Sequence, residues 1–450
     1  MNKLGLYIHI PFCERKCNYC GFLSFSGCED NLKKKYMAAM RNELRYRLGL
    51  LGVGTGGCLA EGGTGGYAVD TVFIGGGTPS TVEPQEIGEV LELVDTSSEV
   101  TLEANPGTLT REKLLAYRKM GINRLSMGVQ SFDDELLQKL GRIHNAEMVY
   151  NNFSLARECG FNNINLDLMF GLPGQSLEAW ENTLNTAIKL SPEHISFYSL
   201  QLEENTPFFK DFEAGKLELP SDELDREMYH RAIAILKAAG YHHYEISNAA
   251  RISEETLKNS DICVNEAINE ISLQNTFFCK HNYKYWSMDE YLGVGLGAAS
   301  FLGGARFKNT DDINEYIEIW RNPESLEVLF GKNDDGRISE ASTEAGSATD
   351  SFSGETFNEN LMKKGTVDWH DNKLHDFVSE FVFTGLRKTE GIDLNEFENR
   401  FGVPFFEYCE SQQAYVDFCI REGYMDTEDA RLRLTERGID ISNSIMAEFV

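Results

Sequence analysis

Three cysteines lie close together near the start of the chain, in the stretch HIPFCERKCNYCGF at residues 9–22. Cys13, Cys17 and Cys20 follow a C-x3-C-x2-C spacing. Such clustered thiols stay reduced when a metal holds them as thiolates, so the spacing indicates a metal site. Zinc is the competing metal, but its sites favour two paired C-x2-C arms, and no second arm follows here. An iron–sulfur cube needs four ligands, so three thiolates would leave one iron open to something else.

A purely structural interpretation competes with the metal site. Positions i, i+4 and i+7 share one face of a helix, which could bury three small side chains. However, Pro11 and Asn18 interrupt the helical signal, and charged residues stand between the first two cysteines. The stretch therefore favours an iron–sulfur site.

Composition limits the classes of function that the chain can have. Its 450 residues carry a net charge of −29, which argues against nucleic acid or an anionic membrane as the main partner. The chain has no run of about 18 apolar residues, so we expect no membrane-spanning helix. The N-terminus resembles neither a signal nor a transit peptide, and the ten cysteines are irregularly spread. We therefore expect a cytoplasmic protein with reduced thiols.

Strands that alternate with helices must position the chemistry. The expected strands lie at residues 5–10, 71–76, 100–105, 124–130, 163–171 and 194–200. Helical patterns lie between them, and Gly121 and Gly160 stand where two of these helices would end. This alternation is typical of a parallel sheet in an α/β protein, and six such units predict a partial (β/α)6 barrel. In barrels, chemistry lies at the C-terminal ends of the strands.

The remaining segments suggest a division into domains. We expect the barrel at 1–250 with a Gly-rich insertion at 52–66, an inserted segment at 251–278, and completion of the barrel at 279–329. Residues 330–366 have the composition of a disordered acidic linker. Residues 367–450 read as a mainly helical, winged-helix-like C-terminal domain, whose acidity favours a structural role over DNA binding.

Polar residues stand where several expected strands end. The turn GGGTPS at 75–80 follows the second strand, and its glycines would let the backbone approach a ligand closely. Glu103, Gln130, Arg142 and Asp167 end or follow later strands. A buried carboxylate at such a place is costly unless it is paired or binds a ligand. For each residue alone, a satisfied structural polar group is an equally good interpretation.

The cysteine spacing, with Tyr19 before the last cysteine, resembles the signature of the radical S-adenosylmethionine (SAM) superfamily. This resemblance implies that Cys13, Cys17 and Cys20 hold a [4Fe-4S] cluster whose open iron binds the amino and carboxylate groups of SAM. One electron from the cluster then cleaves SAM to a 5′-deoxyadenosyl radical. It also implies that Gly76, Gly77 and Thr78 contact the methionine part of SAM.

The motifs YIHIPFC, FIGGGTPS, LEANP, RLSMGVQSF, LGRIHN, NLDLMFGLPGQ, HYEISNAA, GLGAAS and GLRKTEGIDL together resemble the coproporphyrinogen III oxidase-like branch of that superfamily. They cover most of the chain outside three insertions, at 52–66, 251–276 and 330–355. The resemblance implies a SAM pocket, with Glu103 and Asp167 on polar groups of SAM. Its lining would be Tyr7, Tyr19, Glu103, Gln130, Arg142 and Asp167.

Two marks divide this branch. Its oxygen-independent oxidases carry a further cysteine in C-x3-C-x2-C-x-C, where this chain has Phe22. The stretch HNYKYW at 281–286 is similar to the HNxxYW pattern of the heme-binding members. Both features, Phe22 and HNYKYW, resemble the heme-chaperone group. The resemblance makes His281 the candidate axial ligand of heme. A histidine packed among aromatic residues is the competing interpretation.

The resemblance thus implies a heme-binding chaperone that transfers heme to haemoproteins such as respiratory membrane enzymes. The cluster and SAM would support transfer or the formation of a homodimer. The alternative is an oxygen-independent coproporphyrinogen III oxidase, in which the deoxyadenosyl radical removes a propionate hydrogen and loss of CO2 leaves a vinyl group. A third class, another radical-SAM tailoring enzyme, also stays open. The sequence assigns no catalytic residue.

Overall fold

The computed structural model describes residues 1–53, 66–95, 98–252, 276–322 and 362–450. They form two compact units, each assembled from separate pieces of the chain. The first comprises Met1–Glu14, Leu23–Val100 and Glu290–Asp371, and the second comprises Arg15–Phe22, Thr101–Asp289 and Asn372–Val450. The predicted insertions at 52–66 and 251–276 lie largely outside the described residues, and that at 330–355 lies wholly outside them. The domain division expected from the sequence stays a prediction.

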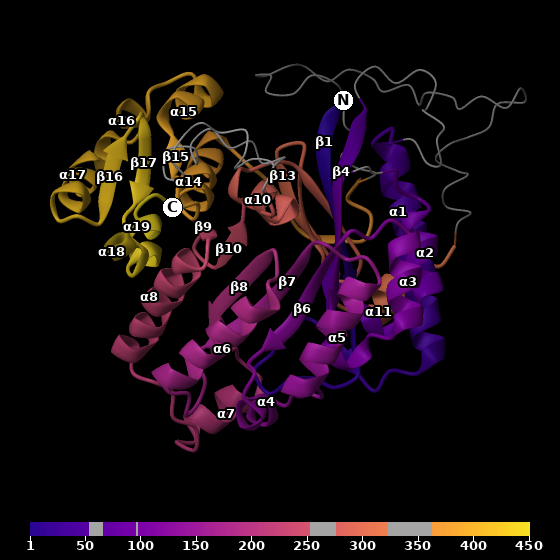
Figure 1. Ribbon diagram of the computed structural model, residues 1–450. Helices are drawn as coiled ribbons and strands as arrows, with labels where there is room; N and C mark the ends of the chain where they lie inside the picture. The colour runs from indigo at the N-terminus through magenta and orange to yellow at the C-terminus, as the bar shows by residue number, and fades with distance from the viewer. Residues whose placement is uncertain (54–65, 96–97, 253–275, 323–361) are drawn as a thin grey trace, which may run out of the picture. The chain divides into compact units, whose positions relative to one another are not determined.

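The first unit is a mixed sheet with the strand order β14-β13-β12-β11-β1-β4. β1 pairs in parallel with both β4 and β11, which buries it and explains its continuous apolar run. Helix α1 packs beside α2 and α11 (Figure 1). The elements are β1 (Asn2–Ile10), β2 (Phe12–Cys13), β3 (Phe25–Ser26), α1 (Asp30–Leu50), β4 (Tyr67–Gly76), η1 (Pro79–Thr81), α2 (Pro84–Leu91), β11 (Tyr291–Val294), β12 (Ala299–Leu302), β13 (Ala305–Asn309), α11 (Ile313–Ile319) and β14 (Thr366–Asp371).

A buried ion pair fixes helix α1 in this unit. Nε of Arg47 lies 2.7 Å from a carboxylate oxygen of Glu43, and neither side chain is exposed. Asn309 donates to Glu43 and accepts from Arg47, and Tyr316 also donates to Glu43. Because buried charges are tolerated only with such partners, the network holds α1 against β13 and α11.

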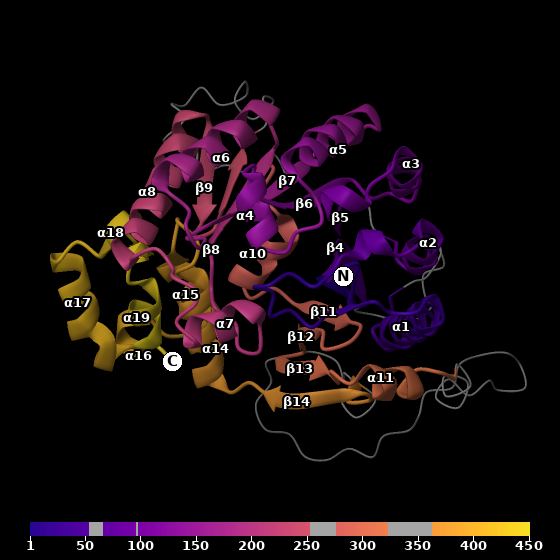
Figure 2. The same cartoon turned by 90° about the horizontal axis from the view of Figure 1, so that it is seen from below.

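The second unit contains strands in the order β5-β6-β7-β8-β10-β9, of which β5 to β8 are parallel. Helices α3, α5, α6 and α8 lie along one side of these strands (Figure 2). The elements up to residue 289 are β5 (Glu99–Ala104), η2 (Pro106–Thr108), α3 (Arg111–Lys119), β6 (Arg124–Gln130), α4 (Asp134–Lys139), α5 (Ala146–Glu158), β7 (Ile164–Phe170), α6 (Leu177–Leu190), β8 (His194–Ser199), α7 (Pro207–Glu213), α8 (Asp222–Ala238), β9 (Tyr241–Glu245), β10 (Asn248–Arg251) and α10 (Lys280–Trp286).

The C-terminal part of the second unit surrounds a three-stranded sheet, β15-β17-β16, with helices. β16 and β17 form an antiparallel pair, as in the wing of a winged-helix fold. The elements are α14 (Leu374–Gly385), β15 (Ile392–Asp393), α15 (Leu394–Phe401), α16 (Phe405–Tyr408), η5 (Glu410–Gln412), α17 (Gln413–Arg421), β16 (Met425–Glu428), β17 (Arg431–Leu434), α18 (Glu436–Ile439) and α19 (Ser442–Ala447).

Local sequence signals explain where these elements begin and end. The side chains of Asn145 and Ser176 accept from backbone N–H groups in the first turns of α5 and α6, as N-caps do. Gly160 has a positive φ of 89° just after α5, which confirms the expected helix end. All six strands expected from the sequence are present as β1, β4, β5, β6, β7 and β8.

Candidate functional site

In the first unit, the Gly-rich turn packs directly on the strand that carries Cys13. The N–H groups of Gly77 and Thr78 donate to the carbonyls of Ile10 and Phe12 at 2.9 and 2.8 Å. A Cβ on Gly77 would lie 2.8 Å from the carbonyl oxygen of Phe12, so only glycine fits. Oγ1 of Thr78 lies 3.6 Å from Sγ of Cys13. The predicted residues of this turn and the first cysteine are therefore neighbours.

Tyr7 lies in the same unit on β1, beside β4. Its hydroxyl is 3.0 Å from Nδ1 of His9, and its ring stacks at 6.3 Å on Phe73. The other nitrogen of His9 lies 2.9 Å from the carbonyl oxygen of Leu23. Burial lowers the pKa of His9, so the ring is neutral at pH 7. This arrangement fixes the orientation of Tyr7.

In the second unit, Arg142 lies beside Cys17. Nη1 of Arg142 is 3.4 Å from Sγ of Cys17, and Nη2 donates to the carbonyl of Gly128. Burial is the main cause that raises the pKa of Tyr19, and the nearby Arg142 opposes it. Nε of Arg142 is buried with no hydrogen-bond partner in the described residues. A guanidinium beside a thiol favours the thiolate, which is the form that binds a metal.

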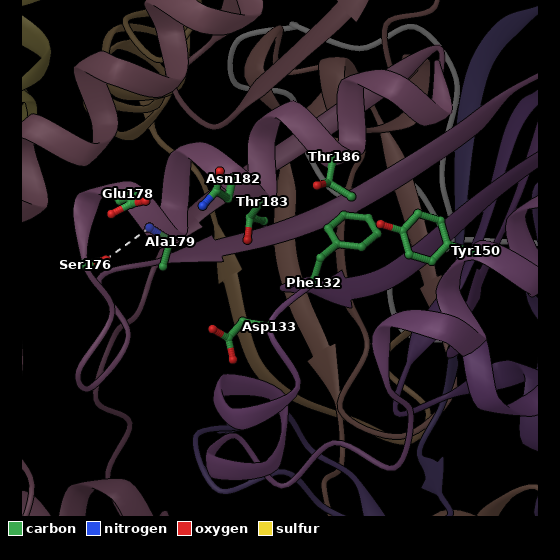
Figure 3. A pocket seen from close by; sticks show the side chains of 9 residues that line it. All are labelled: Phe132, Asp133, Tyr150, Ser176, Glu178, Ala179, Asn182, Thr183 and Thr186. Carbon is green, nitrogen blue, oxygen red and sulfur yellow. Dashed lines mark hydrogen bonds between the residues drawn. The ribbon is translucent and has the colours of Figure 1, made fainter.

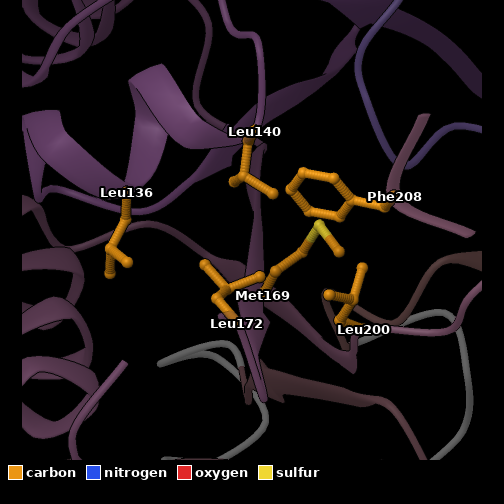
Figure 4. Packing of buried hydrophobic residues seen from close by; sticks show 6 residues of the cluster. All are labelled: Leu136, Leu140, Met169, Leu172, Leu200 and Phe208. Atoms are coloured by element: carbon orange, nitrogen blue, oxygen red, sulfur yellow. The ribbon is translucent and has the colours of Figure 1, made fainter. Parts of the chain in front are cut away.

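Backbone hydrogen bonds anchor the segment that carries Cys17 and Cys20. The N–H of Asn18 donates to Leu140, its side-chain amide donates to Lys139, and its carbonyl accepts from Phe208. Tyr19 packs against an apolar cluster. Figure 4 shows the members of that cluster, which are Leu136, Leu140, Met169, Leu172, Leu200 and Phe208. The position of Tyr19 is therefore set by packing as well as by Arg142.

The strand-end residues of the second unit lie on adjacent strands. Gln130 has a positive φ of 66° at the end of β6, which is unusual for a residue other than glycine. A Cβ on Gly128 would lie 3.0 Å from Arg142 and 3.1 Å from Gln130, so these two side chains meet over that glycine. Backbone strain of this kind is concentrated at functional sites.

Asp167 on β7 is half-buried, and its burial raises the pKa of its carboxyl, although hydrogen bonds from Asn165 and Ser126 lower that pKa. Those bonds measure 2.8 and 3.2 Å. Glu103 on β5 is in register with Ser126 on β6, so one strand lies between Glu103 and Asp167. The second unit thus places Glu103, Gln130 and Asp167 on the adjacent strands β5, β6 and β7, and it places Arg142 beside Cys17.

His281 lies elsewhere in the second unit, on helix α10. The side chain is fully buried, and Nε2 is 2.9 Å from the hydroxyl of Tyr285, one turn further along. Burial lowers the pKa of His281 to about 3, and Lys284 adds to this effect, so the imidazole is neutral at pH 7. A neutral imidazole is the form that binds iron.

The residues that contact α10 were not predicted from the sequence. The guanidinium of Arg387 lies 4.4 Å from the ring centre of Trp286, and Nζ of Lys388 lies 5.5 Å from that of Tyr283. The N–H of Ile246 donates to the carbonyl of Arg387 at 3.1 Å. The motifs HYEISNAA, HNYKYW and GLRKTEGIDL, far apart in the sequence, therefore meet in one place. The only sequence signal of this meeting is that all three motifs resemble the same family.

The chemistry of the three cysteines suits an iron–sulfur cluster, because their thiols are partly exposed. The guanidinium of Arg142 lies beside Cys17, and the hydroxyl of Thr78 lies beside Cys13. In the part of the chain that the structure describes, no group of three or more His, Cys, Asp or Glu side chains is gathered around one point. The assignment of a [4Fe-4S] cluster therefore depends on the cysteine spacing and on the family.

A separate cavity of about 320 Å³ lies between α5, α6 and the loop after β6 (Figure 3). It was not anticipated from the sequence, and none of the predicted site residues lines it. Phe132 and Tyr150 form one wall, and the cap residue Ser176 stands at the start of α6. Its lining is Phe132, Asp133, Tyr150, Ser176, Glu178, Ala179, Asn182, Thr183 and Thr186.

Comparisons with known proteins agree with this arrangement. The family model described as Radical SAM superfamily matches residues 7–187, and that described as HemN C-terminal domain matches residues 373–441. The coproporphyrinogen III oxidase HemN from Escherichia coli has a similar structure, with a TM-score of 0.72 at 21% identity, and the match covers 100% of this chain and 90% of that one. The predicted fold class, a radical-SAM barrel with a C-terminal helical domain, is confirmed.

The fold and the cysteine motif define a radical SAM protein, which implies SAM and a [4Fe-4S] cluster as cofactors. The heme chaperone HemW of Bacillus subtilis is 31% identical over 99% of this chain and 98% of its own length. HemW of Haemophilus influenzae is also 31% identical, with the same coverage. The chain therefore belongs to the HemW heme chaperone family. Among the described residues, no helix is long and apolar enough to cross a membrane.

Proposed function

We propose that this chain is a heme-binding chaperone that carries a [4Fe-4S] cluster and SAM and transfers heme to haemoproteins. The observation that carries the proposal is His281: a buried, neutral imidazole inside HNYKYW, in a chain whose full-length relatives are heme chaperones. The alternative, coproporphyrinogen III oxidation, is less well supported, because Phe22 replaces the extra cysteine of the oxidases and the relatives carry the chaperone name.

The proposed SAM site consists of the residues that the family resemblance implies. Cys13, Cys17 and Cys20 would hold the cluster, which supplies an open iron for the amino and carboxylate groups of SAM. Gly76, Gly77 and Thr78 would contact the methionine part of SAM, and Asp167 and Glu103 would accept hydrogen bonds from its polar groups. The remaining lining residues would be Tyr7, Tyr19, Gln130 and Arg142.

The proposed heme site is centred on α10. His281 would ligate the iron through the nitrogen that contacts Tyr285 in this structure. Tyr283 and Trp286 supply aromatic surface for the porphyrin. Arg387 and Lys388, which lie over those two rings, supply cations for the heme propionates. The site therefore offers a ligand, a stacking surface and a charge partner within one unit.

Binding of heme is the first test. The cluster-reconstituted chain is titrated anaerobically with heme, and the Soret band is followed for wild type, His281→Ala and the control His230→Ala. His230 is partly exposed on α8 and pairs with Asp440. We expect one heme per chain, unchanged binding by His230→Ala, and weakened binding with a shifted Soret band for His281→Ala. Equal binding by all three proteins would remove His281 from the iron, and absence of binding by wild type would refute the function.

The proposal also covers the cellular location of the protein, the acceptors of heme and the oligomeric state. We propose a cytoplasmic protein that delivers heme to haemoproteins, including respiratory membrane enzymes, and that forms a homodimer when loaded. Size-exclusion chromatography with light scattering, with and without heme and SAM, tests the dimer. Transfer of radioactive or isotopically labelled heme to apo-haemoproteins tests delivery. An unchanged monomer or the absence of transfer would reject the corresponding part.

A further inference from the structure

A chain of hydrogen bonds begins at the half-buried Asp167 in the second unit, and its later members are buried. The side-chain amide of Asn165 donates to Oδ1 of Asp167 at 2.8 Å. Oδ1 of Asn165 lies 2.6 Å from Nδ1 of His194, on the neighbouring strand β8. Asn165 is almost fully buried, and His194 is completely buried. Water therefore cannot replace the bond between Asn165 and His194, and breaking it leaves a buried polar group unpaired.

The same chain continues to helix α10. Nε2 of His194 lies 2.8 Å from the hydroxyl of Tyr244, on β9. The backbone N–H of Cys279 donates to that hydroxyl at 3.3 Å. Cys279 is the N-cap residue of α10, two positions before His281. The hydrogen bonds thus connect the carboxylate of the proposed SAM site with the start of the proposed heme helix.

The hydrogen bonds can point in only one direction. Asn165 must turn its NH2 group toward Asp167, because its oxygen already accepts from Ser196 and would repel a carboxylate. The oxygen then faces Nδ1 of His194, which must donate. Burial lowers the pKa of His194 well below its usual value, so the neutral ring carries one proton and Nε2 accepts from Tyr244. Bonds aligned in one direction polarise one another and strengthen cooperatively.

The ring of Tyr244 is also held by packing against the segment before α10. It stacks on Phe278 with ring centres 4.0 Å apart and planes 11° from parallel. Phe278 in turn stacks on Tyr283 of α10, with centres 6.5 Å apart. A shift of the Tyr244 ring would therefore affect both the N-cap residue Cys279 and the Phe278 ring that stacks on Tyr283 of α10.

We propose that His194 and Tyr244 are positioning residues that transmit the occupancy of Asp167 by SAM to helix α10. The inference rests on the proposed function, in which Asp167 contacts SAM and α10 carries the heme ligand. When polar groups of SAM donate hydrogen bonds to Asp167, the carboxylate accepts less strongly from Asn165, and the change passes along the bonds to Cys279. By linkage, heme on α10 alters the affinity for SAM to the same extent.

The test needs no heme. Hydrogen exchange of the cluster-reconstituted full chain is followed by mass spectrometry with and without SAM, on the peptide that spans α10. We expect SAM to change the exchange rate of this peptide in wild type by about fivefold or more, the lower end of ordinary coupling between sites. Tyr244→Phe removes only the hydroxyl and keeps the stack on Phe278. It should abolish the effect on α10 while SAM still protects the peptide that contains Asp167.

Tyr241→Phe is the matched control, because Tyr241 lies on the same strand, is buried, and donates to the carbonyl of Pro192 instead. It should respond to SAM as wild type does. His194→Gln breaks the chain at a second point and should match Tyr244→Phe, so the test stands if one variant does not fold. A wild-type α10 indifferent to SAM, or a full response in Tyr244→Phe, would overturn the inference.

A heme titration with and without SAM separates this inference from the proposed function. If SAM alters α10 through Tyr244 but no heme binds to wild type, the positioning role stands and the chaperone function fails. If heme binds at His281 with the same affinity with and without SAM in wild type, the function stands and the coupling fails.

Discussion

The guanidinium of Arg142 lies 3.4 Å from the sulfur of Cys17, although 125 positions separate the two residues in the sequence. Arg142 is held in place by the carbonyl of Gly128, and a Cβ at that glycine would lie 3.0 Å from its Nη2. A fixed positive charge therefore stands beside one of the three thiols that are expected to hold the cluster.

Replacement of this charge should change the electron affinity of the cluster. A cation stabilises the reduced state, which carries one more negative charge, so Arg142→Met should lower the reduction potential. We expect a shift on the order of 60 mV, which is a tenfold change for a one-electron couple. A redox titration followed by electron paramagnetic resonance measures it. Arg118→Met is the control, because Arg118 bonds the carbonyl of Ile122 instead. Equal potentials in both variants would contradict the role of Arg142.

The contact between Gly77 and Phe12 predicts an intolerance of side chains. In Gly77→Ala the new Cβ would lie 2.8 Å from a carbonyl oxygen, so the turn and the cysteine strand must separate. We expect a loss of about 1–3 kcal/mol in the free energy of unfolding and less iron per reconstituted chain. Gly107→Ala serves as the control, because its nearest neighbour would lie at 3.6 Å. Normal iron content in Gly77→Ala would argue against close packing of the turn on Cys13.

The hydrogen bond between His281 and Tyr285 should oppose heme binding. When the Tyr285 hydroxyl donates to Nε2, it occupies the lone pair that iron needs. Tyr285→Phe should therefore tighten heme binding by about fivefold, the equivalent of one ordinary hydrogen bond of about 1 kcal/mol. Soret titration measures the affinity. Tyr283→Phe, on the same helix but bonded to Glu390, gives the baseline. Weaker binding in Tyr285→Phe than in Tyr283→Phe would show that the hydroxyl assists the ligand.

Glu245 should make stability depend on pH. Burial raises the pKa of its carboxyl from 4.5 to about 7, with Arg387, Asn248 and the Ser247 N–H opposing, and Oε2 has no hydrogen-bond partner in the described residues. Below about pH 4.5 the carboxyl is neutral in both the folded and the unfolded chain, so its ionisation does not lower the free energy of unfolding. Between there and about pH 7 only the unfolded chain ionises, and stability falls by about 3 kcal/mol in total.

Glu245→Gln tests this dependence, because the amide keeps the shape and does not titrate. Denaturant unfolding at a series of pH values compares the two proteins, so other titrating groups cancel in the difference. The variant should gain stability relative to wild type as the pH rises from 5 to 7.5. A difference that stays constant with pH would show that Glu245 ionises normally in the folded chain.

The strands could be foreseen from local patterns. Apolar runs predicted β1, β4, β5, β6, β7 and β8, and the stretch GGGTPS predicted a turn after the second of these strands. The contact of that turn with Cys13 was not predicted. These features depend on a few consecutive residues, and their physical causes, alternation and backbone freedom, act locally. The fold class followed from the order of these elements.

The surroundings of His281 could not be foreseen, because they depend on tertiary contacts between distant segments. Nothing in HNYKYW indicates that Tyr285 holds the imidazole, or that Arg387 lies on Trp286. Likewise, His194 and Asn165 read as ordinary strand residues until the register of β7 and β8 places them together. Their pairing is decided by strand register, which a single sequence does not encode locally.

The discontinuous make-up of the two units has a consequence for biogenesis. The first unit needs Glu290–Asp371 and the second needs Asn372–Val450, so each waits for segments translated late. During synthesis, strands β1 and β4 emerge long before β11, the partner on the other side of β1. Apolar edges are then exposed on the ribosome for many seconds, and we expect the nascent chain to require chaperone protection before it can protect heme itself.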